Sequence, residues 1–463
     1  MTTHDLVVLG GGSAGLSVAV GAAELGLDVA LCDPRAPGGE CTWTGCIPSK
    51  TLIDVARRAH EARSSVGVGV VADDVVVDGS AVMRHVRGTR HTVAEHEDED
   101  VLDDAGVTFH RAAARFVDSH TLAVGDTSLA ARRFVVATGS RPRVPAALAG
   151  VPHLTSDTVW DLDRVPERLV VVGGGPVGVE LGQAFRRLGS EVVLVTEGDR
   201  LLPDAHPEAS RLLRRTLEQE GTSIVSGRSV TGARPDGSAV VLDDGRSVPG
   251  SDLLVATGTT PVTDDLDLET IGVRVRPDGA VSVDARLRTT RPHIHAVGDV
   301  IGAGFTHEAS AQAASALRDM LLPFGHRHRS VRRWAVFTDP EIAQVGRARS
   351  PDHGRVVRLS AEEVDRSVTG AARRGFVDVA VSRLGRIEGA TIVGPHAADA
   401  AAVWAGLVGR PVPDALEVPT VYPTAASATA AVAHRWSRDL LRTPVVGPTI
   451  RSLVRWWWSV RHR

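Results

Sequence analysis

The chain has 463 residues, more than one hydrophobic core usually accommodates, so about two to four packed units are expected. A formal net charge of −4 without a broad basic region argues against nucleic acid as a partner. No apolar run is long enough to cross a bilayer, and the N-terminus lacks the basic region and cleavage site of a secretory signal, so we expect a cytoplasmic protein.

A strand–turn–helix pattern occurs twice in the chain. The apolar run at 6–9 precedes Gly10-Gly11-Gly12-Ser13-Ala14-Gly15, and the run at 169–172 precedes Gly173-Gly174-Gly175-Pro176-Val177-Gly178. A lone GxGxxG also occurs in ordinary tight turns, but a position between a strand and a helix is the context that nucleotide binding requires. There the backbone approaches a pyrophosphate, and the helix N-terminus supplies partial positive charge. The repeat therefore predicts two doubly wound dinucleotide-binding domains.

An acidic residue follows the next strand of each repeat. Asp33 comes after the strand-like run at 29–32, and Glu197 comes after the run at 191–195. A carboxylate at this position accepts hydrogen bonds from a ribose, although a solvated strand end is the simpler alternative. Glu197 would favour the free 2′-hydroxyl of NADH and repel the 2′-phosphate of NADPH. We therefore expect NADH to be preferred. Because Arg200 lies nearby, we do not expect NADPH to be excluded.

Two of the three cysteines, Cys41 and Cys46, lie five positions apart. Pro48 suits a first helical turn, which would place Cys46 at a helix N-terminus, where a thiolate is stabilised. The only lysine, Lys50, follows one turn later in an arginine-rich chain, and arginine cannot supply its compact charge or adjustable pKa. A zinc site would need two more ligands nearby, and structural disulfides are unusual in the cytoplasm. A redox-active pair is therefore expected, whereas Cys32 is expected to be a buried apolar filler.

The rest of the chain indicates how these repeats are connected. Ala137-Thr138-Gly139 and Ala256-Thr257-Gly258 each follow an apolar strand, and a helical, charged stretch is expected from Thr51 to Asp104. The segment from Gly279 onward looks like a return to the first domain. From about residue 331, alternating strands precede an Ala-rich helical end, which indicates a separate α+β domain.

The run from Gly38 to Lys50 resembles the redox motif of the class I pyridine nucleotide–disulfide oxidoreductases, and the chain looks most like mercuric reductase and dihydrolipoamide dehydrogenase. Thr289 to Asp299 is similar to the second FAD motif of this family, and 337–346 to the start of its dimerisation domain. The resemblance implies an α/β fold with two doubly wound Rossmann-like dinucleotide-binding domains and a C-terminal α+β dimerisation domain. The implied ranges are 1–150 for FAD binding and the redox-active cysteine helix, 151–275 for NAD(P) binding, 276–330 for the segment completing the FAD domain, and 331–463 for dimerisation.

The resemblance also implies roles for individual residues. Cys46 would be the thiolate facing the flavin, and Cys41 the thiol that meets the acceptor. Lys50, paired with Glu180, would lie near flavin N5. The residues assigned to FAD are Gly10, Gly12, Ser13, Ala14, Gly15, Asp33, Lys50, Thr138, Gly139, Ser140, Asp299 and His307. Those assigned to NAD(P) are Gly173, Gly175, Pro176, Val177, Gly178, Glu180, Glu197 and Gly258. The enzyme would be a homodimer in which the C-terminal domain of one subunit covers the active site of the other.

The C-terminal region departs from the pattern of the disulfide-reducing members. They carry His-Pro-Thr followed by Glu, whereas this chain has Tyr422-Pro423-Thr424, with Ser427 in the place of Glu. Because a phenol is a poor base at neutral pH, efficient turnover of lipoamide or glutathione disulfide is not expected. Mercuric reductase also looks to have Tyr here, but it carries a C-terminal cysteine pair that this chain lacks. Tyr422 is a catalytic candidate, with packing at a subunit interface as the alternative.

These features predict an FAD-dependent enzyme that passes electrons from NAD(P)H through Cys41 and Cys46 to a metal ion, a disulfide or another small oxidant. The alternatives are direct reduction of quinone or oxygen by the flavin with accessory cysteines, or a flavin redox sensor with little turnover. The Trp- and Arg-rich end, 455–463, suggests weak contact with a membrane surface. Packing against the partner subunit, or a loose end, is the more ordinary interpretation of that segment.

Overall fold

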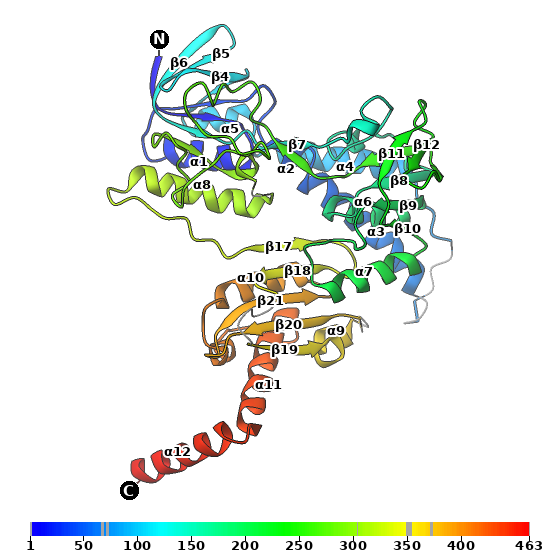
Figure 1. Cartoon of the computed structure of the whole chain (residues 1–463), viewed down its shortest axis with the longest axis vertical. Helices are drawn as coiled ribbons and strands as arrows, with labels where there is room; N and C mark the ends of the chain where they lie inside the picture. Colours follow the sequence, from blue (N-terminus) through cyan, green and yellow to red (C-terminus); the bar gives the residue numbers. More distant parts are fainter. Residues whose placement is uncertain are drawn as a thin grey trace. The chain divides into compact units, whose positions relative to one another are not determined.

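The computed structural model describes residues 2–65, 69–70, 74–302, 304–348, 354–370 and 374–462 (Figure 1). The chain divides into two compact units, Met1–Leu201 with Leu217–Ser330, and Leu202–Thr216 with Val331–Arg463. Within the described ranges, no helix is both long and apolar enough to cross a membrane.

The first repeat forms a largely parallel sheet in the larger unit. Its strand order is β3–β2–β1–β6–β5–β4, and β16 also pairs with β6. Along β1, Val7 and Leu9 enter one buried cluster, and Leu6 and Val8 enter another, which also contains residues of helices α1 and α8. Burial on both faces explains the unbroken apolar run. The bounds are β1 Thr2–Leu9, α1 Ser13–Ala23, β2 Val29–Cys32, β3 Val107–His110, β4 Ala114–Asp118, β5 Thr121–Val124, β6 Thr127–Val136, β16 Ile294–Ala296, η4 Gly298–Ile301 and α8 Thr306–Leu321.

The second repeat forms another parallel sheet, of order β10–β9–β8–β14, in the same unit. A short antiparallel sheet, β11–β12–β13, follows in the chain, and β15 pairs with β7. The predicted strand–turn–helix–strand pattern is thus confirmed in both repeats. The bounds are β7 Ser140–Pro142, η2 Ala146–Leu148, η3 Val159–Asp161, β8 Arg168–Val172, α6 Pro176–Arg187, β9 Glu191–Thr196, β10 Ser223–Ser226, β11 Val230–Ala233, β12 Ala239–Leu242, β13 Ser247–Pro249, β14 Asp252–Val255 and β15 Thr259–Pro261.

The stretch predicted to be helical contains several helices. The short helix α2, Gly39–Trp43, precedes α3, Cys46–Ser64, which is followed by α4, Gly79–Ala94, and α5, Glu99–Asp104. Residues 66–68 and 71–73 of the predicted stretch lie outside the described residues. The side chains of Asp78 and Asp98 accept hydrogen bonds at the starts of α4 and α5, as N-cap residues do.

The smaller unit is built on an antiparallel sheet of order β17–β18–β21–β20–β19. Residues of α10 and α11 share one buried cluster with this sheet, in which Trp404 is fully buried. This confirms the α+β character predicted for the C-terminal part. The bounds are α7 Pro207–Gln219, β17 Arg333–Val336, β18 Ile342–Gly346, β19 Arg355–Ser360, η5 Ala361–Glu363, α9 Asp365–Thr369, β20 Phe376–Val381, β21 Ile387–Val393, α10 Ala397–Leu407, η6 Val412–Leu416, η7 Ala425–Ser427, α11 Ala428–Arg442 and α12 Val446–Arg461.

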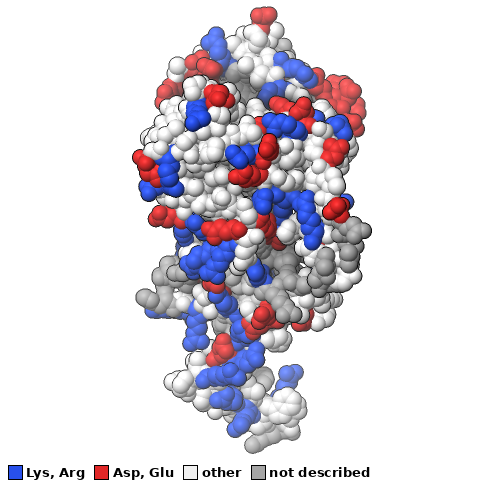
Figure 2. Space-filling model, turned by 90° about the vertical axis from the view of Figure 1, so that its right-hand side faces the viewer, with Lys and Arg blue, Asp and Glu red and all other residues white. Residues whose placement is uncertain are grey.

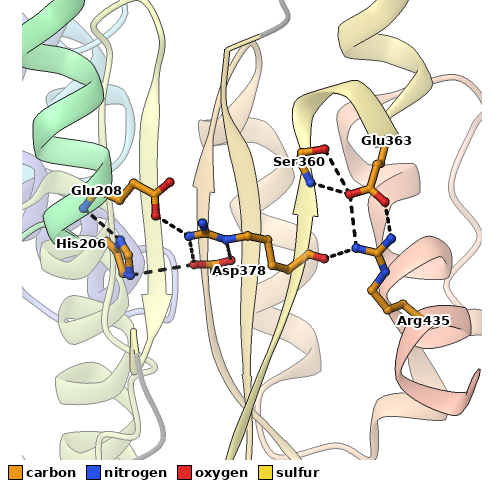
Figure 3. A network of polar contacts seen from close by, with 7 residues as sticks. His206, Glu208, Ser360, Glu363, Asp378 and Arg435 are labelled. Atoms are coloured by element: carbon orange, nitrogen blue, oxygen red, sulfur yellow. Dashed lines mark hydrogen bonds and ion pairs between the residues drawn. The ribbon is translucent and has the colours of Figure 1, made fainter. Parts of the chain in front are cut away.

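Charged side chains connect 202–216 to this sheet (Figure 3). The guanidinium of Arg358 donates to both carboxylate oxygens of Asp378 at 2.7 Å and to Glu208 at 2.7 Å. His206 Nε2 lies 3.9 Å from the same Asp378 carboxylate, which is almost fully buried. Because a buried carboxylate needs hydrogen-bonding partners, this network ties the start of α7 to strands β19 and β20.

Candidate functional site

Cys41 and Cys46 lie on consecutive helical segments. Cys41 is part of α2, and Cys46 is the first residue of α3, as the position of Pro48 predicted. The N-cap residue Gly45 has no side chain to accept hydrogen bonds from the first turn of α3. The free N–H groups there can stabilise negative charge on Cys46. Both cysteines are partly buried free thiols.

Cys46 is the more acidic member of the pair. Its Sγ is hydrogen-bonded to Thr306 Oγ1 at 3.2 Å. The contact with Cys41, followed by Thr306 and the Lys50 ammonium, lowers the pKa of Cys46 to about 6 against the opposing effects of burial and Glu180. The interaction with Cys46, followed by burial, raises the pKa of Cys41. The site therefore favours a thiolate at Cys46 beside a protonated thiol at Cys41.

Lys50 forms an ion pair with Glu180, with 3.0 Å between Nζ and Oε2. The lysine is on α3, one turn after Cys46, and the glutamate is on α6, the helix that opens the second repeat. The Glu180 side chain is 7% exposed, whereas the Lys50 side chain is 38% exposed. The buried carboxylate thus fixes a partly accessible ammonium one turn of α3 from Cys46.

Hydrogen bonds to the backbone hold the loop between the cysteines. Trp160 Nε1 donates to the carbonyl oxygen of Thr44 at 2.7 Å, and Arg90 donates to that of Trp43 at 3.1 Å. Trp43 Nε1 donates in turn to the carbonyl oxygen of Pro37 at 2.7 Å. Because Trp160 and Arg90 come from distant segments, the tertiary fold fixes the loop conformation around Cys41 and Cys46.

The first glycine turn has the geometry of a nucleotide-binding turn. Gly10 has a φ of 107°, and a Cβ there would lie 2.3 Å from the carbonyl oxygen of Ala137. A Cβ at Gly15 would lie 1.8 Å from the carbonyl oxygen of Gly10, so only glycine allows α1 to approach β1 this closely. Asp33, which is 5% exposed, accepts a hydrogen bond from the N–H of Gly11 at 2.7 Å. Helix α1 starts at Ser13, followed by Ala14, without a side-chain cap from Gly12.

The second glycine turn repeats this geometry. Gly173 has a φ of 128°, and its Cβ would lie 2.1 Å from the carbonyl oxygen of Ala256. Helix α6 begins at Pro176 after an N-cap, Gly175, that provides no side-chain hydrogen bond. Val177 is exposed in its first turn, and Gly178 packs against the backbone of Gly173. Glu197 is exposed immediately after β9, and Gly258 adopts a positive φ after β14.

Among the remaining residues assigned to FAD, Ser140 contacts Asp299. Ser140 Oγ donates to one carboxylate oxygen of Asp299 at 3.2 Å, and the N–H of Gly304 donates to the other at 3.1 Å. Burial raises the pKa of Asp299. Thr138 Oγ1 instead donates to the carbonyl oxygen of Val262 at 2.6 Å. Next to Thr138, Gly139 has a positive φ. His307 is exposed in the first turn of α8, directly after the Thr306 that contacts Cys46.

Sequence reasoning missed Thr306 and Glu40. Thr306 is 260 positions from Cys46 in the chain, and its only sequence signal was its place beside His307. Glu40 directly precedes Cys41, and burial, followed by the charges of Asp299, Asp157 and Cys46, raises the pKa of Glu40 to about 7. Its signal was that it is the only carboxylate in the segment from Gly38 to Lys50.

Tyr422 belongs to the smaller unit and is 70% exposed. Its hydroxyl donates a hydrogen bond to Asp365 Oδ2 at 2.8 Å, and this contact raises the pKa of Tyr422. Ser427 donates to the carbonyl oxygen of Thr424 at 2.6 Å. The partner of the tyrosine is therefore Asp365 of α9, which sequence reasoning did not identify. The acidic partner stabilises the protonated phenol and makes it a weaker acid, so less phenolate is present to act as a base at neutral pH.

The sequence profile of the family described as "Pyridine nucleotide-disulphide oxidoreductase" matches residues 4–316. The chain belongs to this family. A mercuric reductase from Bacillus cereus is 30% identical over 94% of this chain and 72% of its own length. A dihydrolipoyl dehydrogenase from Haloferax volcanii is 34% identical over 92% of this chain and 95% of its own length. The solved structure of LpdA from Mycobacterium tuberculosis is similar, with a TM-score of 0.84 and 26% identity, over 94% of this chain and 100% of that one.

Membership confirms the predicted fold class and identifies the protein as an oxidoreductase of the pyridine nucleotide–disulfide oxidoreductase family. The family implies FAD and a pyridine nucleotide, and the described residues fit FAD. The uncapped start of α1 offers free N–H groups to a pyrophosphate, as the second turn does at α6. Three buried or partly buried carboxyl groups, Asp33, Glu40 and Asp299, lie in the same domain and suit a ligand rich in hydroxyl donors.

The pKa of Cys46 predicts how its reactivity depends on pH. Because the thiolate is the nucleophile, we expect alkylation of Cys46 by iodoacetamide in the reduced protein to accelerate as pH rises through about 6. Thr306→Val removes one stabilising hydrogen bond and should move this midpoint upward by about one pH unit. Mass spectrometry of the alkylated peptide separates Cys46 from Cys41.

Ser310→Ala is the matched control, because Ser310 lies one turn further along α8 and bonds only to the backbone of Thr306 among the described contacts. Its midpoint should equal that of the native protein. A native midpoint near the ordinary thiol value of about 8.5, or no change in Thr306→Val, would contradict this account of the site.

Proposed function

We propose that this protein is an FAD-dependent NAD(P)H oxidoreductase that passes electrons through Cys41 and Cys46 to a metal ion, a disulfide or another small oxidant. The observation that carries the proposal is the pair of partly buried thiols, Cys41 and Cys46, with Cys46 at the start of α3, one turn from the Lys50–Glu180 ion pair. When bound, FAD would supply a hydride acceptor for NAD(P)H and a donor of an electron pair to the disulfide. The disulfide would take up two electrons and one proton and open into the Cys41 thiol and the Cys46 thiolate.

Individual residues of the chain would have separate roles in this electron transfer. Lys50 would place positive charge where negative charge develops, and Glu180 would hold it there. Thr306 and the start of α3 would stabilise the Cys46 thiolate. Cys41 would attack the acceptor after losing its proton, since a thiolate from a less acidic thiol is the stronger nucleophile.

The environment of Tyr422 indicates which chemical class of acceptor suits the site. Its phenol is hydrogen-bonded to Asp365, which raises its pKa, so it is poorly suited to remove a proton from a dithiol at neutral pH. A metal ion displaces the thiol proton into solvent when it binds, so its capture by the two cysteines depends less on such a base. We therefore favour a metal ion or another small non-disulfide oxidant.

An acceptor screen tests this proposal. NADH oxidation would be followed with a thiol-binding metal ion, lipoamide, glutathione disulfide and a quinone, in the native protein and in Cys41→Ser. The proposal requires an acceptor whose reduction depends on Cys41. Reduction of quinone alone, at equal rates in both proteins, would instead support direct transfer from the flavin.

We propose NADH as the preferred donor because Glu197 is exposed immediately after β9, where its carboxylate would meet the ribose 2′-position. The kcat/KM with NADH should exceed that with NADPH by about tenfold, and Glu197→Ser should reduce this difference. The variant Arg200→Ser is a control that separates the effect of this neighbouring cation from the effect of Glu197. A kcat/KM with NADPH equal to or above that with NADH would contradict the preference.

We also propose a cytoplasmic homodimer in which 331–463 supplies the interface. In this arrangement, residues 1–150 and 276–330 would bind FAD, and residues 151–275 would bind NAD(P). Within the last range, residues 202–216 also contact the C-terminal sheet. The exposed Tyr422, in the smaller unit, would then be available to a second subunit. We propose that the C-terminal tail, 455–463, takes no part in electron transfer.

A further inference from the structure

The last helix, α12, is fixed at its start and is not a frayed end. Arg451 Nη1 donates to the carbonyl oxygen of Leu441 at 2.9 Å, and Gly447 donates to the carbonyl oxygen of Thr443 at 3.2 Å. A Cβ at Gly447 would lie 2.1 Å from the carbonyl oxygen of Leu441, so the turn from α11 into α12 requires glycine. The turn therefore sets the direction in which α12 leaves α11.

Beyond this turn, every residue from Arg451 to His462 is exposed. The exposed fractions of Trp456, Trp457 and Trp458 are 61%, 58% and 65%. Large apolar side chains gathered on one exposed helix usually mark a binding surface, whereas isolated ones need no explanation. The described contacts of this chain leave that surface without a partner.

The helix separates apolar from polar side chains around its circumference. At 3.6 residues per turn, Ile450, Leu453, Val454, Trp457 and Val460 lie on one side, with Trp456 and Trp458 at its two borders. Arg451, Ser452, Arg455 and Ser459 lie on the opposite side. Arg461 lies at the end of the apolar side, where its long side chain can bend toward water. Roughly half of the circumference is therefore apolar, with Trp at both edges.

The charge of this segment is opposite to that of the rest of the chain. Five arginines and no acidic residue follow Asp439, although the whole chain has a formal charge of −4. In Figure 2 the part that corresponds to α12 shows blue and white side chains without red among the described residues. Such a segment attracts an anionic surface and repels a second copy of itself.

We propose that α12 binds the surface of an anionic lipid bilayer, lying in the plane of the interface. An apolar side this broad suits a helix half-immersed among acyl chains, with its border tryptophans at the depth of the headgroups. A protein groove would instead engage a narrower stripe of side chains. Sixteen residues with interior arginines are too short and too polar to span the bilayer.

Cosedimentation of the full-length protein with vesicles tests the proposal. We expect binding to phosphatidylserine–phosphatidylcholine vesicles, weaker binding to phosphatidylcholine alone, and release as salt screens the attraction. The combined change Arg455→Gln and Arg461→Gln should weaken binding about 30-fold, because each removes one cation near the surface. Trp456→Ser, Trp457→Ser and Trp458→Ser together should abolish it.

The control is Leu384→Ser, since Leu384 is 86% exposed elsewhere in the same unit. It should bind vesicles as the native protein does. Sedimentation velocity of the triple tryptophan variant distinguishes a lipid from a second copy. An unchanged oligomeric state together with lost vesicle binding supports the proposal. Loss of the native oligomer, absence of vesicle binding in the native protein, or equal binding to neutral vesicles would overturn it.

Discussion

Cys41→Ser should reduce the turnover of the cysteine-dependent acceptor by about 10³-fold or more. The hydroxyl of serine cannot form the disulfide, and it is too weakly acidic to replace the thiol as a nucleophile. Reduction of a quinone directly by the flavin should remain within about twofold of native. Steady-state kinetics with both acceptors on the same preparation would measure the two effects.

Cys32→Ala is the matched control for loss of a thiol. Cys32 lies in β2, is 2% exposed, and its pKa is raised to about 12, chiefly by burial. The substitution Cys32→Ala should therefore leave both activities unchanged, although it should slightly lower the stability of the protein. If Cys41→Ser retained full turnover with every acceptor, the cysteines would be accessory and the flavin alone would be the reducing centre.

Lys50→Met should slow reduction of the bound flavin by NADH about 10²-fold. The substitution keeps the length of the side chain but removes the ammonium held 3.0 Å from Glu180. It also leaves Glu180, whose side chain is 7% exposed, without its cation. The pKa of Cys46 should rise, because Lys50 is one of the groups that lower it. Stopped-flow absorbance measures flavin reduction, and alkylation of Cys46 reports the pKa.

Arg57→Met removes a cation from the same helix as a control. Arg57 pairs with Asp54 on the exposed side of α3. Its replacement should therefore change neither the rate of flavin reduction nor the alkylation of Cys46. Lys50→Arg asks whether charge alone suffices. We expect partial recovery, because the planar guanidinium presents its charge differently from an ammonium. A native rate in Lys50→Met would contradict the role proposed for the ion pair.

Local patterns in the sequence were enough to predict much of the fold and part of the site. The glycine turns, the helix start at Cys46 and the parallel strand pairs of the two repeats follow from residues close together in the chain. The fold class is confirmed by family membership and by the likeness to LpdA. Roles for individual residues, such as the binding of FAD by Asp33, remain predictions.

Contacts between distant residues could not be read from these patterns. Thr306 meets Cys46 only because α8 and α3 are brought together by the fold. The raised pKa of Glu40 depends on burial and on carboxylates far along the chain. Similarly, Asp365 was not identified as the partner of Tyr422, and the attachment of 202–216 to the C-terminal sheet rests on the long-range pair of Glu208 and Arg358.

NADH should reduce a disulfide between Cys41 and Cys46, and the proposed electron path depends on this step. Counting thiols in the denatured protein, before and after anaerobic addition of NADH, tests it most directly. The chain has three cysteines, so the oxidised protein should show one thiol, that of Cys32, and the NADH-treated protein three. Peptide mapping would assign the two new thiols to Cys41 and Cys46. An unchanged count, after the disulfide has been shown to be present at the start, would contradict the account.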